Sequence, residues 1–310
     1  MRTSGRLLLL AQFLVSTALA QNWPVLVQPP ARANSYQKSK EAPHQYRTRL
    51  FEITSFKDHR DQTLRDFVIC AESVPEVIQK LPLPLYAPPE KSPFQIHIHQ
   101  DTDSFLAAGG AMGTAGFYAR RTQTALLQWD FLFDRNTRPD RIPEPNFDLM
   151  IHELAHLSMH GLIPRIEVWL SEGIAEYLVA AHIQSGLYRF DKIDIAIVKR
   201  IKNRHPDSNG SFNLPPLSKL LSATSRDWLA TSKGKSGDQA LEPYDASLLL
   251  VHYSFHGGAE RRKKTRLYFR QAHQGKPEAL LFPVEKAPAI EKALVTYWKK
   301  KGLKLSFRSP

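Results

Sequence analysis

The sequence predicts an α+β fold in which a small mixed sheet precedes a helix with a His-Glu-x-x-His motif and a mostly helical C-terminal lobe. Segments that favour strands lie before residue 132, and from Asn146 onwards apolar residues recur with helical spacing. After removal of a predicted leader of 20 residues, 290 residues remain, which is enough to bury such a core. We therefore expect four parts, at residues 1–20, 21–45, 46–146 and 147–310.

The first part, residues 1–20, has the pattern of a secretory signal peptide. Arg2 and Arg6 precede an apolar run over Leu7–Val15, and Ala18-Leu19-Ala20 forms a small-residue cleavage site. This pattern predicts cleavage after Ala20 and a secreted or periplasmic protein. No other stretch of the sequence is long and apolar enough to predict a transmembrane segment.

Residues 21–45 are rich in Pro, Gln, Ser and Lys, which predicts a loose lead-in. The following α+β region is expected to contain one helix over 66–80 and a glycine-rich flexible loop over 109–116. Strands are expected near 46–53, 94–100 and 124–131.

The remaining part, residues 147–310, shows the helical recurrence of apolar residues in seven segments. Helices are expected near 147–160, 168–184, 191–203, 215–222, 245–255, 260–273 and 285–300.

The segment His152-Glu153-Leu154-Ala155-His156 predicts a metal site. Residues four apart on a helix share a face, so both imidazoles can reach one metal while Glu153 projects beside it. Catalytic zinc needs three protein ligands and keeps a fourth position for water. Glu172, on a separate predicted helix, can complete the set. We therefore expect one Zn²⁺ per chain, bound by His152, His156 and Glu172, with Glu153 as the general base.

Two alternatives compete with this interpretation. His160 continues the four-residue step, but it lies eight residues from His152, about 12 Å along a helix, whereas each zinc ligand lies about 2 Å from the metal. We therefore expect His160 at a helix end or in a pocket wall. The other alternative is a solvated helix with ordinary histidines. The helical apolar spacing on both sides of the motif, at Leu149 and Leu157 among others, argues against it.

These motifs resemble the peptidase-MA-like gluzincin zinc metallopeptidases, especially their bacterial secreted branch, long catalogued as a domain of unknown function. The matching segments are the H-E-L-A-H motif, Trp169–Tyr177 with its W-L-S-E-G-x-A-E-Y pattern, and Tyr244-Asp245-Ala246-Ser247. The resemblance implies that Glu176, four positions after Glu172, hydrogen-bonds a ligand histidine. Such a bond fixes the tautomer of the histidine and raises its basicity.

The resemblance also implies a tyrosine that donates a hydrogen bond to the oxyanion of the reaction. Tyr244, expected at the start of a helix that runs to Phe255, is the candidate, and Tyr177 is the reserve. In gluzincins an edge strand above the zinc helix pairs with extended substrate. The resemblance assigns this role to the strand over 124–131.

The expected function is zinc-dependent hydrolysis of peptide bonds in a peptide or protein substrate, by an endopeptidase. Aminopeptidase gluzincins carry a G-x-M-E-N segment, whereas Gly110-Ala111-Met112-Gly113-Thr114 lacks its Glu and Asn. A third class is a cell-envelope binding protein that retains the metal without catalysis. Glu153 argues against that class, because a closed structural zinc site has no use for a base.

The net charge of +12 describes the surface rather than the fold. Basic clusters at 261–264 and 299–301 favour an anionic cell-envelope surface, an acidic substrate or a nucleic acid. No nucleic-acid motif accompanies them, so nucleic-acid binding is not expected. The sequence has one cysteine, Cys70, so an intrachain disulfide is excluded.

Overall fold

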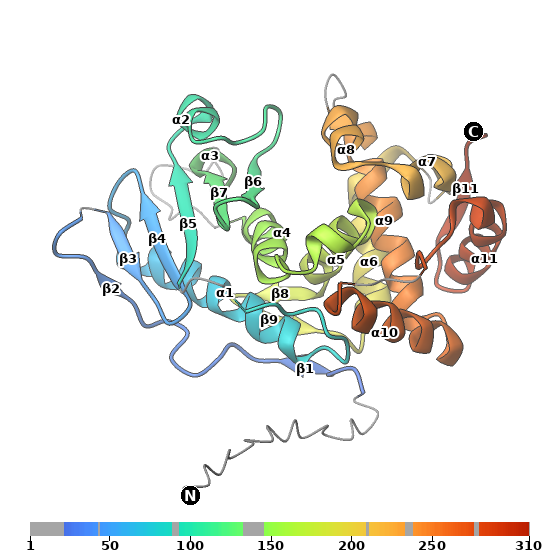
Figure 1. Cartoon of the computed structure of the whole chain (residues 1–310), viewed down its shortest axis with the longest axis horizontal. Coiled ribbons are helices and arrows are strands. Elements are labelled where there is room, and N and C mark those ends of the chain that lie inside the picture. Colours follow the sequence, from blue (N-terminus) through green and yellow to red (C-terminus); the bar gives the residue numbers. More distant parts are fainter. Residues whose placement is uncertain are drawn as a thin grey trace, which may run out of the picture.

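The computed structural model describes residues 22–42, 44–88, 93–132, 146–208, 211–232, 238–275 and 279–309 (Figure 1). The predicted signal peptide, residues 1–20, lies outside the described residues. The fold is α+β, as the sequence predicts: a mixed sheet lies on one side of the helix that carries the His-Glu-x-x-His motif and a helical lobe on the other. Among the described residues, no helix combines the length and apolar character needed to cross a membrane.

The main sheet has six strands in the order β2-β3-β4-β5-β7-β6. Its central strands β4, β5 and β7 run parallel to one another, while β2, β3 and β6 pair antiparallel with their neighbours. The strands are β2 (Gln37–Lys38), β3 (Gln45–Arg47), β4 (Phe51–Ser55), β5 (Phe94–His99), β6 (Gly116–Ala119) and β7 (Thr124–Gln128). Two short helices, α2 (Thr102–Ala107) and α3 (Trp129–Leu132), follow β5 and β7.

The strand expected to bind substrate is not an edge strand. β7 lies between β5 and β6, and all five of its residues are buried, so its backbone groups are already paired on both sides. The edge is formed by β6, which begins at Gly116 within the segment expected to be a flexible loop. The prediction failed because it rested on the resemblance alone, whereas the unbroken apolar run Ala125-Leu126-Leu127 is typical of an interior strand.

The helices α1 (Asp61–Lys80) and α4 (Phe147–Ser158) pack against each other. α1 begins five residues earlier than expected and buries Phe67, Cys70, Val74 and Ile78 in the common core. α4 contacts β6 and β7 as well. The helix of the metal motif is therefore held between α1, the sheet and the C-terminal lobe.

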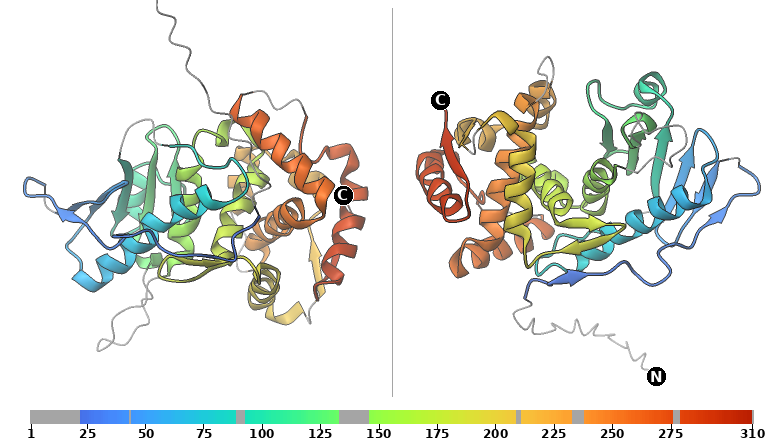
Figure 2. Two further views of the ribbon diagram at one scale, coloured as in Figure 1. Left: turned by 90° about the horizontal axis from the view of Figure 1, so that it is seen from below. Right: turned by 180° about the vertical axis from the view of Figure 1, so that it is seen from behind.

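The C-terminal lobe is helical, and Figure 2 shows it on the far side of α4 from the sheet. α5 packs most extensively against α9, and Gly173 allows their close approach, because a Cβ at this position would lie 2.5 Å from the carbonyl oxygen of Ser247. The helices are α5 (Val168–Ala181), α6 (Ile193–Arg204), α7 (Leu217–Ser222), α8 (Ser225–Ser232), α9 (Asp238–His256), α10 (Ala259–His273) and α11 (Ala287–Lys299).

Short 3-10 helices and strands connect these elements. The 3-10 helices are η1 (Ile163–Arg165), η2 (Pro206–Ser208) and η3 (Val284–Lys286). The strands, which the sequence did not predict, are β1 (Leu26–Val27), β8 (His182–Gln184), β9 (Leu187–Arg189), β10 (Ser211–Leu214) and β11 (Lys304–Phe307). α9 begins seven residues earlier than expected, so Tyr244 lies inside this helix rather than at its start.

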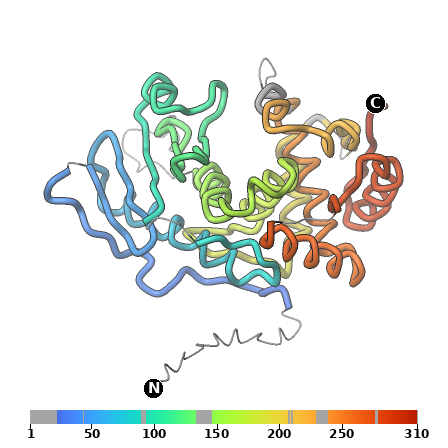
Figure 3. Tube along the Cα trace, in the orientation of Figure 1, coloured from blue at the N-terminus to red at the C-terminus, as the bar shows by residue number. Residues whose placement is uncertain are grey.

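The segment before β3, expected to be a loose lead-in, is partly ordered. It crosses beneath the molecule from the helical lobe to the sheet (Figure 3). β1 pairs with β9, and the Trp23 ring lies 4.6 Å from the His256 ring and 5.7 Å from the Tyr177 ring, between centroids. These contacts attach the N-terminal segment to the C-terminal lobe.

Candidate metal centre

α4 places the two motif histidines one turn apart. The side chain of Asn146 accepts a hydrogen bond from the backbone N–H of Asp148 and so caps the helix. Met150, Ile151, Leu154, Ala155 and Leu157 are fully buried and fix the rotation of the helix. His152 and His156 therefore point to one side, where their Nε2 atoms lie 3.2 Å apart.

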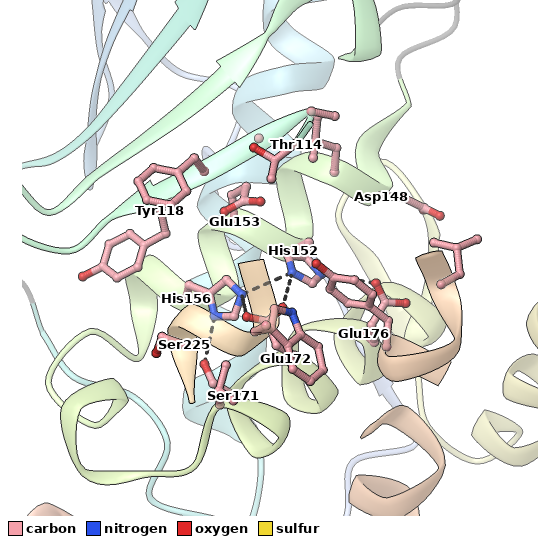
Figure 4. A pocket seen from close by; sticks show the side chains of 18 of the residues that line it. Thr114, Tyr118, Asp148, His152, Glu153, His156, Ser171, Glu172, Glu176 and Ser225 are labelled. Carbon is pink, nitrogen blue, oxygen red and sulfur yellow. Dashed lines mark hydrogen bonds and ion pairs between the residues drawn. The ribbon is translucent and has the colours of Figure 1, made fainter. Parts of the chain in front are cut away.

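α5 contributes the third group. Its Glu172 carboxylate lies with Oε2 at 3.1 Å from His152 Nε2 and Oε1 at 3.5 Å from His156 Nε2 (Figure 4). Among the described residues, these three side chains form the cluster of metal-binding groups. The structure thus brings together the three ligands that the sequence predicts.

The spacing of the donor atoms fits zinc. Ligand bonds of about 2.0–2.1 Å in a tetrahedral arrangement place neighbouring donor atoms about 3.3 Å apart. The two Nε2 atoms lie 3.2 Å apart, and the Glu172 oxygen nearest to each of them lies at 3.1 Å from His152 and at 3.5 Å from His156, close to this value. Two imidazoles and one carboxylate are also the donor set of known catalytic zinc sites, which leave one position for water.

Each histidine of the cluster has its second ring nitrogen engaged. Nδ1 of His152 lies 3.2 Å from Oε1 of Glu176, and Nδ1 of His156 lies 3.0 Å from Oγ of Ser171. A carboxylate accepts the Nδ1–H of His152, which leaves the Nε2 lone pair directed at the cluster. The position of Glu176 agrees with the role that the resemblance implies, whereas sequence reasoning missed Ser171, although it directly precedes Glu172.

Two arginines of α6 hold Glu176 in place. Arg204 Nη2 and Arg200 Nη2 lie 2.7 and 3.2 Å from Oε2 of Glu176. Burial acts to raise the pKa of Glu176, but the charge of Arg204, the hydrogen bond with His152 and the charge of Arg200 outweigh it and lower this pKa. Glu176 is therefore a carboxylate and can accept the His152 proton. Arg204 also pairs with Asp245 of α9, next to Tyr244.

Glu153 is buried beside the cluster and faces β6. Burial raises the pKa of its carboxyl group, and the charges of His152 and His156 only partly offset this effect. The backbone N–H of Tyr118 on β6 hydrogen-bonds the carboxylate. Gly116 is required here, because a Cβ at this position would lie 2.8 Å from Cγ of Glu153.

The cluster opens into a cavity of about 660 Å³. Its wall is made by the β6 segment, α4, α5, α6, α8 and α9, and includes apolar side chains on several sides. The apolar members of the wall are Phe117, Leu149, Ile163, Ile166, Val168, Trp228 and Leu241. A cavity of this size next to a metal-type cluster can enclose several residues of a peptide.

Of the two tyrosine candidates, Tyr244 lines this cavity and Tyr177 does not. The Tyr244 ring lies 5.9 Å from the His152 ring, between centroids, and burial raises the pKa of its phenol, so the hydroxyl keeps its proton. Tyr177 is fully buried, and its hydroxyl lies 2.9 Å from His256 Nε2. The reserve assignment to Tyr177 is therefore wrong.

His160 lies beyond the last residue of α4, where its Nδ1 is 3.2 Å from the carbonyl oxygen of Leu157. Its ring packs near Phe94, outside the metal-type cluster. The expected helix-end position is confirmed, and the structure offers His160 no access to the donor atoms of His152 and His156.

Comparison with protein-family models, with curated proteins and with solved structures finds no match to this chain. The function is therefore inferred from the geometry and chemistry of the site.

Proposed function

We propose that this chain is a zinc-dependent peptidase of the gluzincin type that uses one Zn²⁺ per chain. The observation that carries the proposal is the cluster of His152, His156 and Glu172, in which the two Nε2 atoms lie 3.2 Å apart and each lies within 3.5 Å of a Glu172 oxygen, with the Glu153 carboxylate beside them. A structural zinc site needs a fourth protein ligand and no base. Among the described residues, the cluster holds three ligands and opens into a cavity.

Glu153 is the general base of the proposed reaction. Bound zinc would supply Lewis acidity and lower the pKa of a coordinated water toward about 7. Glu153 accepts a proton from the attacking water and passes it to the leaving amine, which requires a carboxylate within reach of both. Its position between the histidine cluster and the edge strand β6 supports this role.

β6 is the proposed substrate-binding strand, in place of the 124–131 strand. The carbonyl oxygen of Ala115 accepts a hydrogen bond from the N–H of Gln128, on the β7 side. Because backbone groups alternate along a strand, those of Gly116 and Tyr118 face away from β7. Both residues line the cavity, so an extended peptide can pair with the Gly116 end of this edge, next to Glu153, whose carboxylate already binds the Tyr118 N–H.

The charges in the cavity favour an endopeptidase over an aminopeptidase. An aminopeptidase needs a carboxylate for the substrate's free amine. The carboxylates in the described cavity wall are Asp148, Glu153, Glu172 and Glu176. Asp148 and Glu176 pair with Arg200, and the other two belong to the proposed zinc chemistry. No described carboxylate of the wall is left for an amine.

The direct test is a degenerate peptide library with acetylated N-termini, incubated with the purified protein in the presence of zinc. We expect cleavage at internal bonds, because the site needs no free amine, and we expect a zinc chelator to abolish it. Cleavage restricted to the same peptides with free N-termini would favour an aminopeptidase. Zinc binding with no cleavage of either library would favour the binding protein.

Tyr244 is the proposed donor to the oxyanion. We expect Tyr244→Phe to lower kcat by about 10²-fold or more, the scale for losing one such donor, with little change in KM. The ring and its packing against Trp228 are retained in this variant. Steady-state kinetics on one acetylated peptide measure the effect. A kcat near that of the wild type would show that Tyr244 is a packing residue.

The proposed location is secreted or periplasmic, from the signal-peptide pattern of residues 1–20. The proposed partner is a peptide or protein substrate. The basic clusters at 261–264 and 299–301 are consistent with residence at an anionic cell-envelope surface.

A further inference from the structure

Within the described part of the chain, Arg120 is a cavity cation with no carboxylate beside it. Three of the described arginines line the cavity. Arg200 is paired with Asp148 and Glu176, and Arg204 with Glu176 and Asp245. Arg120 is exposed, and no described carboxylate lies within ion-pair distance of it. Its charge is therefore available to a ligand, whereas the other two positive charges are neutralised within the protein.

Arg120 lies a short distance along β6 from the point where a bound peptide would be cleaved. Arg120 directly follows the last residue of the edge strand β6 and lies two residues beyond Tyr118, whose N–H reaches Glu153. A strand rises about 3.3 Å per residue, so the Arg120 backbone lies about 7 Å along the strand from the point that faces the base. A peptide paired with β6 would place a side chain two or three residues from the cleaved bond beside this guanidinium.

We propose that Arg120 forms a subsite for an acidic side chain of the substrate, two or three residues from the cleaved bond. This inference rests on the proposed peptidase function and names its preferred substrate class, peptides with Asp or Glu at that position. A guanidinium binds a carboxylate with two parallel hydrogen bonds, which gives geometric selectivity as well as attraction. The net charge, +12 for the full sequence and +10 without Arg2 and Arg6 of the predicted signal peptide, adds long-range attraction for acidic substrates.

The test uses acetylated peptides that differ from one parent by a single Glu, Gln or Lys, scanned through the three positions on each side of the cleaved bond. For the wild type we expect kcat/KM to favour Glu over Gln by about 2- to 5-fold at one position, the range of a solvent-accessible ion pair. The preference should shrink at high salt. Arg120→Met should remove it, and Arg120→Glu should shift the Glu-over-Lys ratio by about 10-fold or more.

Arg121→Glu is the matched control, since Arg121 is the exposed neighbour in the same turn and does not line the cavity. It makes the same change in net charge and should keep the wild-type preference. The same comparison can be made without turnover in the zinc-loaded Glu153→Gln variant. There the dissociation constants of labelled Glu and Gln peptides are measured with and without the additional Arg120→Glu substitution.

Three outcomes overturn the subsite: no Glu preference at any position, a preference that survives Arg120→Glu, or an equal loss in Arg121→Glu, which would assign the effect to net charge. In each of these cases Glu153-dependent cleavage still supports the peptidase. If no peptide is cleaved in a Glu153-dependent way, the peptidase proposal fails and the subsite falls with it.

Discussion

Replacing Glu153 by glutamine is expected to leave zinc binding intact while lowering kcat by about 10²- to 10⁴-fold, the contribution of a positioned general base. The amide keeps the shape of the side chain but cannot accept a proton from water. Glu153 is beside the cluster rather than one of its three donors, so the metal should remain. We therefore expect the zinc content, measured by atomic emission, to stay at the wild-type level while kcat on an acetylated peptide falls.

The nearby carboxylate Glu176 provides a control for this experiment. Glu176→Gln also exchanges a buried carboxylate for an amide, but it weakens the hydrogen bond to His152 and should act on zinc affinity, by about 10- to 100-fold. At saturating zinc it should retain much more activity than Glu153→Gln. Equal activity of Glu153→Gln and the wild type would place the chemistry elsewhere.

Replacing Glu172 by glutamine is expected to weaken zinc binding by more than about 100-fold, since losing a ligand should exceed the loss of an outer hydrogen-bond partner. The charged oxygens that lie 3.1 and 3.5 Å from the two Nε2 atoms become a neutral amide, which is a poor zinc ligand. Competition with a fluorescent zinc chelator measures the dissociation constant.

His160→Ala is the control for Glu172→Gln. It removes a histidine that the sequence offers as a rival ligand but that lies beyond the end of α4. We expect zinc affinity close to that of the wild type. Zinc loss in His160→Ala with retention in Glu172→Gln would show that the third ligand has been misassigned.

The candidate metal-binding residues could be predicted from the sequence because the spacing within each of their two helices is local. His152 and His156 are one helical turn apart whatever the rest of the fold does. Glu172 and Glu176 are likewise one turn apart on α5 and so share one face of that helix, which the packing of α5 against α4 turns toward the histidines. Helical geometry also excludes Tyr177, because the next residue points about 100° away from Glu176, here into the core.

The remaining parts of the site depend on contacts between elements distant in the sequence. Arg200 and Arg204 reach Glu176 only because α6 packs against α5, and no local pattern identifies such a pairing. The edge strand was misassigned for the same reason. β6 is four residues long and starts at a glycine within a glycine-rich segment, so its pairing with β7 cannot be read from periodicity.

The most direct test of the central claim is a zinc titration of the metal-stripped wild-type protein, monitored by cleavage of an acetylated peptide, with Glu153→Gln titrated in parallel. We predict that wild-type activity returns in proportion to added zinc and saturates at about one equivalent per chain, while Glu153→Gln binds the same amount and stays inactive. Activity that persists in the stripped protein, or full zinc binding by the wild type without any cleavage, would contradict the proposal.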